Sequence, residues 1–125
     1  METYFKILCV DDEKLFLGLL QLMLNEKLFE IDVAYDGGDA VTMAFENHYD
    51  LILMDINMPE MDGIIASKTI RTMLPKIPII SVSALDANAI EGAEIFTASI
   101  RKPIEKHEIR SLILKVLNYE EKNKG

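Results

Sequence analysis

Short runs of apolar residues alternate along the chain with segments in which apolar residues recur at helical spacing. The apolar runs predict strands at 5–10, 31–35, 51–55, 78–82 and, more weakly, 97–101. The helical segments are 13–25, 39–46, 63–74, 86–95 and 104–117, and Gly37 and Gly38 are expected to separate the second strand from its helix. Bounded apolar runs of this kind are typical of strands buried on both faces. The alternation predicts an α/β fold with a doubly wound, five-stranded parallel sheet and helices on both faces.

Polar groups that can do chemistry stand where the predicted strands end. Asp11 and Asp12 follow the apolar run of the first strand, and Asp55 ends the third. Ser83 follows the fourth strand and Lys102 follows the fifth. In a doubly wound sheet the carboxyl ends of the strands meet at one edge, outside which ligands bind. We therefore expect these five residues to share one pocket.

Three carboxylates in one pocket repel one another and require a cation. Hard oxygen ligands in an open, hydrated arrangement suit Mg²⁺. A lysine and a serine hydroxyl beside them would suit a phosphoryl group, whose oxygens need neutralising. A carboxylate can itself be the nucleophile and form an acyl phosphate.

Each of these residues also has a plainer interpretation when it is taken alone. Asp11 or Asp12 would serve as a cap for the helix that follows, because acids favour helix N-termini. Ser83 would be a cap or a loop residue, and Lys102 a surface charge. Asp55 is harder to explain in this way, since a carboxylate directly after a buried run needs compensation. The occurrence of all of them in this order favours the shared pocket.

Composition narrows the classes of protein that fit. The 125 residues are enough for one domain, which we expect to span 1–119, with 120–125 as a polar tail or a truncated linker. The net charge of −8 argues against direct binding to nucleic acid and suits cations or partners with basic patches. The single cysteine, Cys9, lies within an apolar run and is expected to be a buried thiol. Neither a membrane-length apolar run nor a signal peptide is evident, so we expect a cytoplasmic location and no membrane insertion.

Four motifs together resemble the receiver domain of bacterial two-component response regulators, most closely the single-domain receivers of the chemotaxis type. The resemblance covers about residues 5–118, and its motifs are Val10-Asp11-Asp12, the string Asp55-Ile56-Asn57-Met58-Pro59-Glu60-Met61-Asp62-Gly63, Ser83-Ala84 and Lys102-Pro103. It implies a flavodoxin-like sheet of order 2-1-3-4-5 with the acidic pocket at the carboxyl edge.

The resemblance also implies roles for the pocket residues. Asp55 would accept a phosphoryl group from a phosphohistidine of a partner. Asp12 and Asp55 would bind Mg²⁺ directly, with the backbone carbonyl of Asn57, and Asp11 would act through water. Ser83 and Lys102 would then contact the phosphoryl group.

Further expectations from the resemblance concern the backbone and the partners. The bond between Lys102 and Pro103 is expected to be cis, as in the family. The partner would be a histidine kinase or a histidine phosphotransfer protein of a two-component system or phosphorelay. We expect the unphosphorylated chain to be a monomer. Its only catalysis would be its own phosphorylation and dephosphorylation.

The first predicted helix carries two apolar stripes. One, expected to be core, consists of Phe16, Leu19, Leu20, Met23 and Leu24. The other runs through Leu15, Gly18 and Leu22 and is expected, with Met58, to dock the partner's helices.

The pattern departs from the family in one region. Ser99 stands where the family has an aromatic switch residue, and the interval from Ser83 to Lys102 is shorter than usual. We therefore expect an unusual output surface over 85–101 that works without an aromatic rotamer change. Two other functions stay open at this point: a pseudo-receiver that is never phosphorylated, and an aspartate-nucleophile phosphohydrolase. The latter needs a second acid two residues after the nucleophile, where this chain has Asn57.

Overall fold

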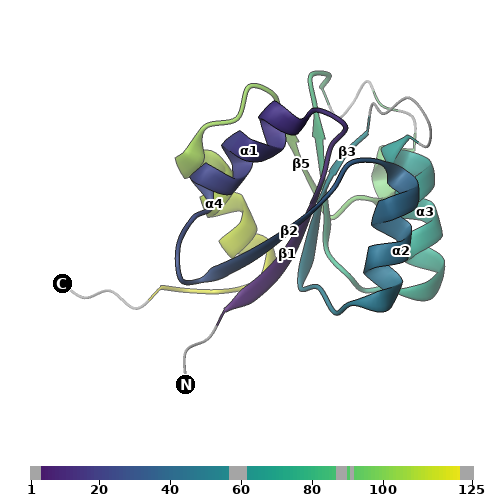
Figure 1. Cartoon of the computed structure of the whole chain (residues 1–125), viewed down its shortest axis with the longest axis horizontal. Coiled ribbons are helices and arrows are strands. Elements are labelled where there is room, and N and C mark those ends of the chain that lie inside the picture. Colours follow the sequence, from purple (N-terminus) through teal and green to yellow (C-terminus); the bar gives the residue numbers. More distant parts are fainter. Residues whose placement is uncertain (1–3, 57–61, 87–89, 91, 122–125) are drawn as a thin grey trace.

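The chain forms three layers, with a parallel sheet between two pairs of helices (Figure 1). The structure is a computed structural model that describes residues 4–56, 62–86, 90 and 92–121. The strand order is β2-β1-β3-β4-β5, and every neighbouring pair is parallel, as predicted. The strands are β1 (Phe5–Val10), β2 (Phe29–Ala34), β3 (Leu51–Asp55), β4 (Ile79–Ser83) and β5 (Ala98–Arg101). The helices are α1 (Lys14–Met23), α2 (Gly37–Glu46), α3 (Gly63–Met73), the short 3₁₀ helix η2 (Ala93–Ile95) and α4 (Lys106–Val116).

Alternate residues of each central strand supply two separate cores. Ile7 and Cys9 of β1 face α1 and α4, whereas Leu8 and Val10 face α2 and α3 (Figure 1). Burial raises the pKa of the Cys9 thiol to about 12, so this cysteine is a neutral core residue, as expected. Because both faces of the sheet are covered, its strands read as continuous apolar runs in the sequence.

The expectations about α1 and about the start of α2 are wrong. Gly37 and Gly38 do not separate a strand from a helix but form the first turn of α2, where Asp36 accepts a hydrogen bond from the Asp39 backbone N–H at 2.7 Å. Glycine costs little there, because the first amides of a helix have no intrahelical partner. On α1, Leu19 is 47% exposed, and Leu17, at 2%, takes its place in the core. The apolar face of this helix is wide, so the sequence did not determine which of its leucines face the sheet.

The connection from β4 to β5 departs from the predicted helix at 86–95. Within its described residues it contains only the 3₁₀ helix η2; residues 87–89 and 91 lie outside them. Arg71 of α3 holds this segment, since its Nε donates to the Ile95 carbonyl at 3.1 Å. Its Nη1 donates to the Pro75 carbonyl at 3.2 Å, in the loop between α3 and β4. Partial burial lowers the pKa of this guanidinium. A partly buried arginine that donates to backbone carbonyls thus helps to fix a segment in which the described residues form little helix.

The end of the chain is attached to the domain body. Tyr119 packs edge-on against Phe5, with ring centroids 5.4 Å apart. Arg110 of α4 pairs with Glu26 at 2.7 Å and with Glu121 at 2.7 Å, and these hydrogen bonds raise the pKa of the guanidinium. Contacts with the body therefore continue into the predicted tail as far as Glu121. Across the described residues, we find no helix with the length and apolar composition that crossing a bilayer requires.

Candidate acidic site at the carboxyl edge of the sheet

Three carboxylates meet where β1 and β3 end. One carboxylate oxygen from each of Asp11, Asp12 and Asp55 lies within 4.8 Å of the others. The sheet register explains this, because Val10 and Met54 are partners in neighbouring parallel strands. Asp11 is 1% exposed and Asp55 4%, whereas Asp12 is open to solvent. The predicted acidic pocket therefore exists, with two buried acids and one exposed acid.

The electrostatics of this cluster favour a divalent cation. Like charges at about 4 Å repel by ~1 kcal/mol even in water, and by more where burial reduces screening. Oxygen ligands with an open side to solvent match the preference of Mg²⁺, which keeps several waters. Asp11 and Asp12 do not cap α1 with their side chains. Instead, Asp11 Oδ1 accepts a hydrogen bond from the Glu13 backbone N–H at 2.9 Å, which orients its other oxygen.

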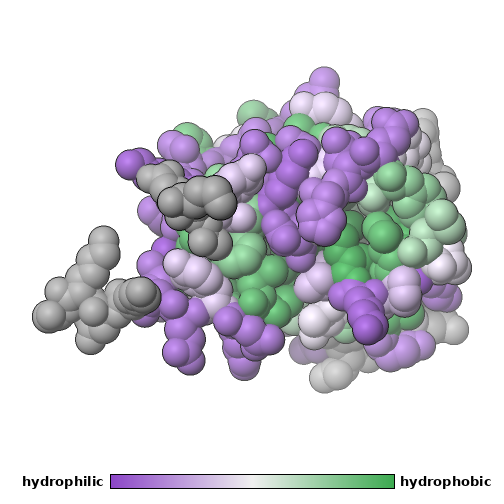
Figure 2. Space-filling model, turned by 90° about the horizontal axis from the view of Figure 1, so that it is seen from below, coloured by the Kyte–Doolittle hydropathy of each residue, from purple (hydrophilic) through white to green (hydrophobic). Residues whose placement is uncertain are grey.

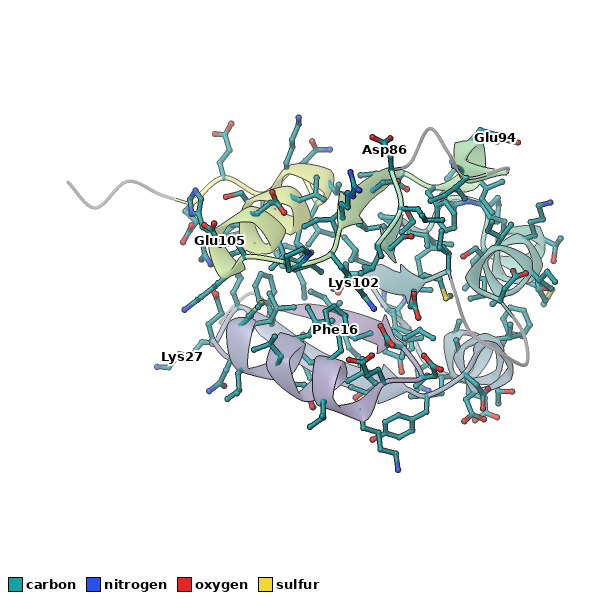
Figure 3. The ribbon with its side chains drawn as sticks, turned by 90° about the horizontal axis from the view of Figure 1, so that it is seen from above. Phe16, Lys27, Asp86, Glu94, Lys102 and Glu105 are labelled. Atoms are coloured by element: carbon teal, nitrogen blue, oxygen red, sulfur yellow. The ribbon has the colours of Figure 1, made fainter. Side chains whose placement is uncertain are left out.

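Lys102 follows the edge strand β5, and its side chain extends toward the acids at the ends of β1 and β3. Its backbone N–H donates to the Ser83 carbonyl at 2.7 Å, which extends the pairing of β4 with β5. Its Nζ lies 3.0 Å from Asp11 Oδ2 and 4.1 Å from the centre of the Phe16 ring. Figure 3, which looks down on the carboxyl ends of the strands, shows the labelled side chains of Phe16 and Lys102 side by side. Lys102 is thus a pocket residue rather than a surface charge, and its peptide bond to Pro103 is cis.

Ser83 ends β4 beside the acidic cluster. It is buried, and its hydroxyl accepts a hydrogen bond from the Leu85 backbone N–H at 3.0 Å. Its neighbour in β4, Val82, is the register partner of Asp55. A serine that bonds two residues onward forms a local turn. The hydroxyl would leave this turn if it were to contact a group on Asp55.

Gly63 is a residue whose structural role the sequence did not reveal. A Cβ there would lie 2.1 Å from the Asp55 carbonyl oxygen and 2.6 Å from the Ile56 Cα, so only glycine fits. Its N–H donates to the Ile56 carbonyl at 3.2 Å, and Asp62 caps α3 through the Ile65 N–H at 2.8 Å. The start of α3 is therefore pressed against the backbone of Asp55. The pair Asp62-Gly63 was the available signal, since it ends the longest of the four motifs.

An apolar stripe on α1 lies open to solvent near the acids. Leu15 is 87% exposed and Leu22 73%, and Leu19, which was predicted to be core, belongs to the same stripe. Gly18 stands between them, with open space where a Cβ would be. Asn57 and Met58, the other residues expected at the metal and at the docking surface, lie outside the described residues.

The position of the missing aromatic is occupied by a polar pair. Ser99 of β5 and Ser81 of β4 are hydrogen-bonded through their hydroxyls at 2.6 Å. Beside them is a small cleft of about 170 Å³ lined by Ser83, Leu85, Asp86 and Arg101 among others. Arg101 Nε donates to the Ala84 carbonyl at 3.1 Å. The segment after Ser83 is thus held by a residue next to Lys102.

Two larger clefts have none of the three acids among their lining residues, although Lys102 lines the first of them. One of about 1020 Å³ runs between β5 and α4, and one of about 450 Å³ is formed by residues 47–50 and 73–78 before β3 and β4. The second lies at the amino ends of the strands. Figure 2 looks onto that side and shows apolar surface in its middle and over the side of α2 and α3. Neither cleft brings together the candidate groups, so the acidic edge is the candidate site.

Comparisons with known proteins agree with this assignment. The family model for the response regulator receiver domain matches residues 7–117. The transcriptional regulatory protein ResD of Bacillus subtilis is 39% identical over 107 residues, which cover 83% of this chain and 44% of that protein. SrrA of Staphylococcus aureus is 38% identical over 107 residues, which again cover 83% of this chain and 44% of that protein. The chain thus spans less than half the length of these curated relatives.

Solved structures share the fold closely. The response regulator TrrA of Thermotoga maritima, in complex with Mg²⁺ and BeF, has a TM-score of 0.84 at 29% identity, over 90% of this chain and 98% of that one. The Francisella response regulator 1452 receiver domain has a TM-score of 0.82 at 31% identity, over 91% and 97%. The chemotaxis protein CheY4 of Vibrio cholerae has a TM-score of 0.84 at 25% identity, over 91% and 99%.

If the three carboxylates form one cation site, Asp12→Asn will stabilise the chain without Mg²⁺ and reduce the stabilisation that Mg²⁺ gives. Without Mg²⁺ the variant should unfold at a higher temperature than the native chain, by about 4 °C for each kcal/mol of repulsion removed. With Mg²⁺ it should gain much less stabilisation than the native chain, because a ligand is lost. Thermal unfolding followed by circular dichroism measures both. Glu13→Gln removes the adjacent charge outside the cluster and serves as the control. Equal Mg²⁺-induced shifts in Asp12→Asn and the native chain would rule out a shared site.

Proposed function

The chain belongs to the response regulator receiver domain family, and on that premise we propose that Asp55 is its phosphoacceptor. The observation that carries the proposal is the convergence of Asp11, Asp12 and Asp55 on one edge of the sheet, with the Lys102 ammonium 3.0 Å from Asp11. Ser83 stands at the end of the next strand. An acid nucleophile, a cation site and a fixed positive charge are the parts that phosphoryl transfer requires.

In this proposal the Asp55 carboxylate attacks the phosphorus atom of a phosphohistidine. A bond forms between a carboxylate oxygen and phosphorus, the bond from phosphorus to nitrogen breaks, and the imidazole leaves with its electron pair. The product on this chain is an acyl phosphate. Asp12 and Asp55 would hold Mg²⁺ directly, with the Asn57 carbonyl, and Asp11 through water. When bound, Mg²⁺ would supply positive charge to the phosphoryl oxygens.

Phosphorylation would change what Ser83 and Lys102 contact. The phosphoryl group adds negative charge and strong acceptor oxygens next to both side chains. Lys102 would then be shared between Asp11 and the new oxygens, and the Ser83 hydroxyl would leave its bond with the Leu85 N–H. The turn after β4 and its neighbour Arg101 would shift with it. Such a local rearrangement is how a charge-changing modification biases a surface between two states.

Two rival functions are less well supported. A pseudo-receiver has no need of the acids or the lysine, yet this chain keeps them in contact at one edge. An aspartate-nucleophile phosphohydrolase requires an acid two residues after the nucleophile, and Asn57 stands there. The signalling role therefore fits the residues better than hydrolysis of a separate substrate.

For the partner we propose a histidine kinase or a histidine phosphotransfer protein, acting in the cytoplasm, where the family works. The exposed α1 stripe of Leu15, Gly18 and Leu22 starts on the first turn of the helix that follows Asp12, so a donor helix lying along it would reach the acids. The curated relatives are transcriptional regulators more than twice as long as the matched segment. With a net charge of −8, this segment itself is not expected to contact nucleic acid.

Incubation with acetyl phosphate and Mg²⁺ tests the phosphoacceptor directly. We expect the intact mass to rise by one phosphoryl group, because the acid cluster supplies the nucleophile and the cation site. Asp55→Asn should abolish the gain, and removal of Mg²⁺ with EDTA should suppress it. Asp86→Asn, an acid that lies outside the cluster, is the matched control and should be phosphorylated normally. A native chain that gains no phosphoryl group would favour the pseudo-receiver.

Leu15→Asp and Leu22→Asp test the docking stripe separately from the chemistry. The donor is a phosphorylated histidine kinase that acts on the native chain. Each substitution should slow phosphotransfer from it by about tenfold or more, as expected for a central apolar contact of an interface. Phosphorylation by acetyl phosphate should be unchanged, because the pocket is untouched. Met73→Asp, at an exposed apolar residue at the end of α3, is the control. Undiminished transfer to folded Leu15→Asp and Leu22→Asp would contradict docking at α1.

A further inference from the structure

Phe16 is the aromatic residue that contacts the acidic site. It lies on α1, half-buried at the margin of the core shared by α1 and α4. The Lys102 Nζ is 4.1 Å from the centre of its ring, well within the range of a cation–π contact. The same ammonium is 3.0 Å from Asp11 Oδ2. The lysine head is therefore held between a carboxylate and the face of a ring (Figure 3).

The contacts of Lys102 indicate what the Phe16 ring does. The backbone of Lys102 is fixed by its hydrogen bond to the Ser83 carbonyl, but its four-carbon side chain is flexible and only 25% exposed. Asp11 holds the ammonium by charge and would hold it less once other anions compete. Phe16 attracts the cation without taking a proton or a hydrogen bond from it. It can therefore restrict where the ammonium lies and still leave its donors free for other oxygens.

Core packing alone does not account for an aromatic at this position. The buried residues of α1, Leu17 and Leu20, and its C-cap Leu24 are all aliphatic, and Phe16 only borders their cluster. A leucine at 16 would cover much of the same apolar surface. What a leucine lacks is the negative potential of a ring face, which the Lys102 ammonium meets in this structure.

We propose that Phe16 is a positioning residue for phosphoryl transfer, whose ring holds the Lys102 ammonium beside Asp11 at the place from which it meets the phosphoryl oxygens on Asp55. This inference rests on the proposed phosphoacceptor role. In this proposal the ring acts through Lys102, the side chain whose ammonium it contacts. Its contribution is to keep the lysine from swinging into solvent before the phosphoryl group arrives.

Phe16→Leu removes the ring and Phe16→Tyr keeps it, so the two form a matched pair. We expect Phe16→Leu to be phosphorylated by acetyl phosphate and Mg²⁺ about fivefold more slowly than the native chain, and Phe16→Tyr to be close to native. Proton NMR of the Lys102 ε-methylene gives a readout that needs no phosphorylation. Its resonances should be shifted upfield by the ring current in the native chain and in Phe16→Tyr, and unshifted in Phe16→Leu. Thermal unfolding identifies any variant whose fold is damaged.

A double-mutant cycle with Lys102→Met separates positioning from general packing. If Phe16 acts through Lys102, Phe16→Leu should slow phosphorylation in the native background and have no further effect in the Lys102→Met background. Equal slowing by Phe16→Leu in both backgrounds would overturn the proposal. So would a Phe16→Leu variant that is phosphorylated at the native rate, together with a lysine resonance that is unshifted in the native chain. A native chain that is not phosphorylated at all, with a normally shifted lysine resonance, would instead overturn the phosphoacceptor role on which the proposal depends.

Discussion

The mutual repulsion of three carboxylates is the constraint on which the rest of this structure depends. Asp11 and Asp55 are buried at the ends of adjacent parallel strands, and Asp12 stands beside them. Burial of such a cluster is tolerated only where positive charge is supplied. Lys102 supplies part of it through Asp11, and a divalent cation would supply the rest. Adding or removing charge at this site, as a cation or a phosphoryl group would, should therefore change the contacts of its side chains. A switch controlled by phosphorylation depends on such a change.

The fold around the acids is built to hold this cluster in place. Gly63 lets the start of α3 press against the backbone of Asp55, and the two cores keep both faces of the sheet covered. The side of the sheet toward β5 includes polar contacts, among them the Ser81–Ser99 hydroxyl pair and the Arg101 bond to Ala84. Polar contacts of this kind can rearrange at small cost, which suits the surface change that the proposed phosphorylation would bring about.

Apolar runs in the sequence predicted the parallel sheet, and the shared carboxyl edge of such a sheet predicted the meeting of the acids. The strand order came from the resemblance to receiver domains, and the structure has that order. The sequence predicted the face of α1 less well, since Leu17 and Leu19 are equally apolar and only packing against the sheet decides which is buried. The contact of Phe16 with Lys102 was not predictable from spacing, because it depends on where a flexible side chain ends. The close approach at Gly63 depends likewise on how α3 meets β3.

Borohydride reduction of the phosphorylated chain, followed by peptide mass spectrometry, tests the central claim most directly. An acyl phosphate is reduced to an alcohol, so a phosphorylated aspartate becomes homoserine at the position that carried the phosphoryl group. The account predicts homoserine at position 55 alone, formed after incubation with Mg²⁺ and a phosphodonor and not after incubation with the donor and EDTA. Homoserine at 11 or 12, or at 55 regardless of Mg²⁺, would contradict a site in which Asp55 is the nucleophile and its neighbours hold the cation.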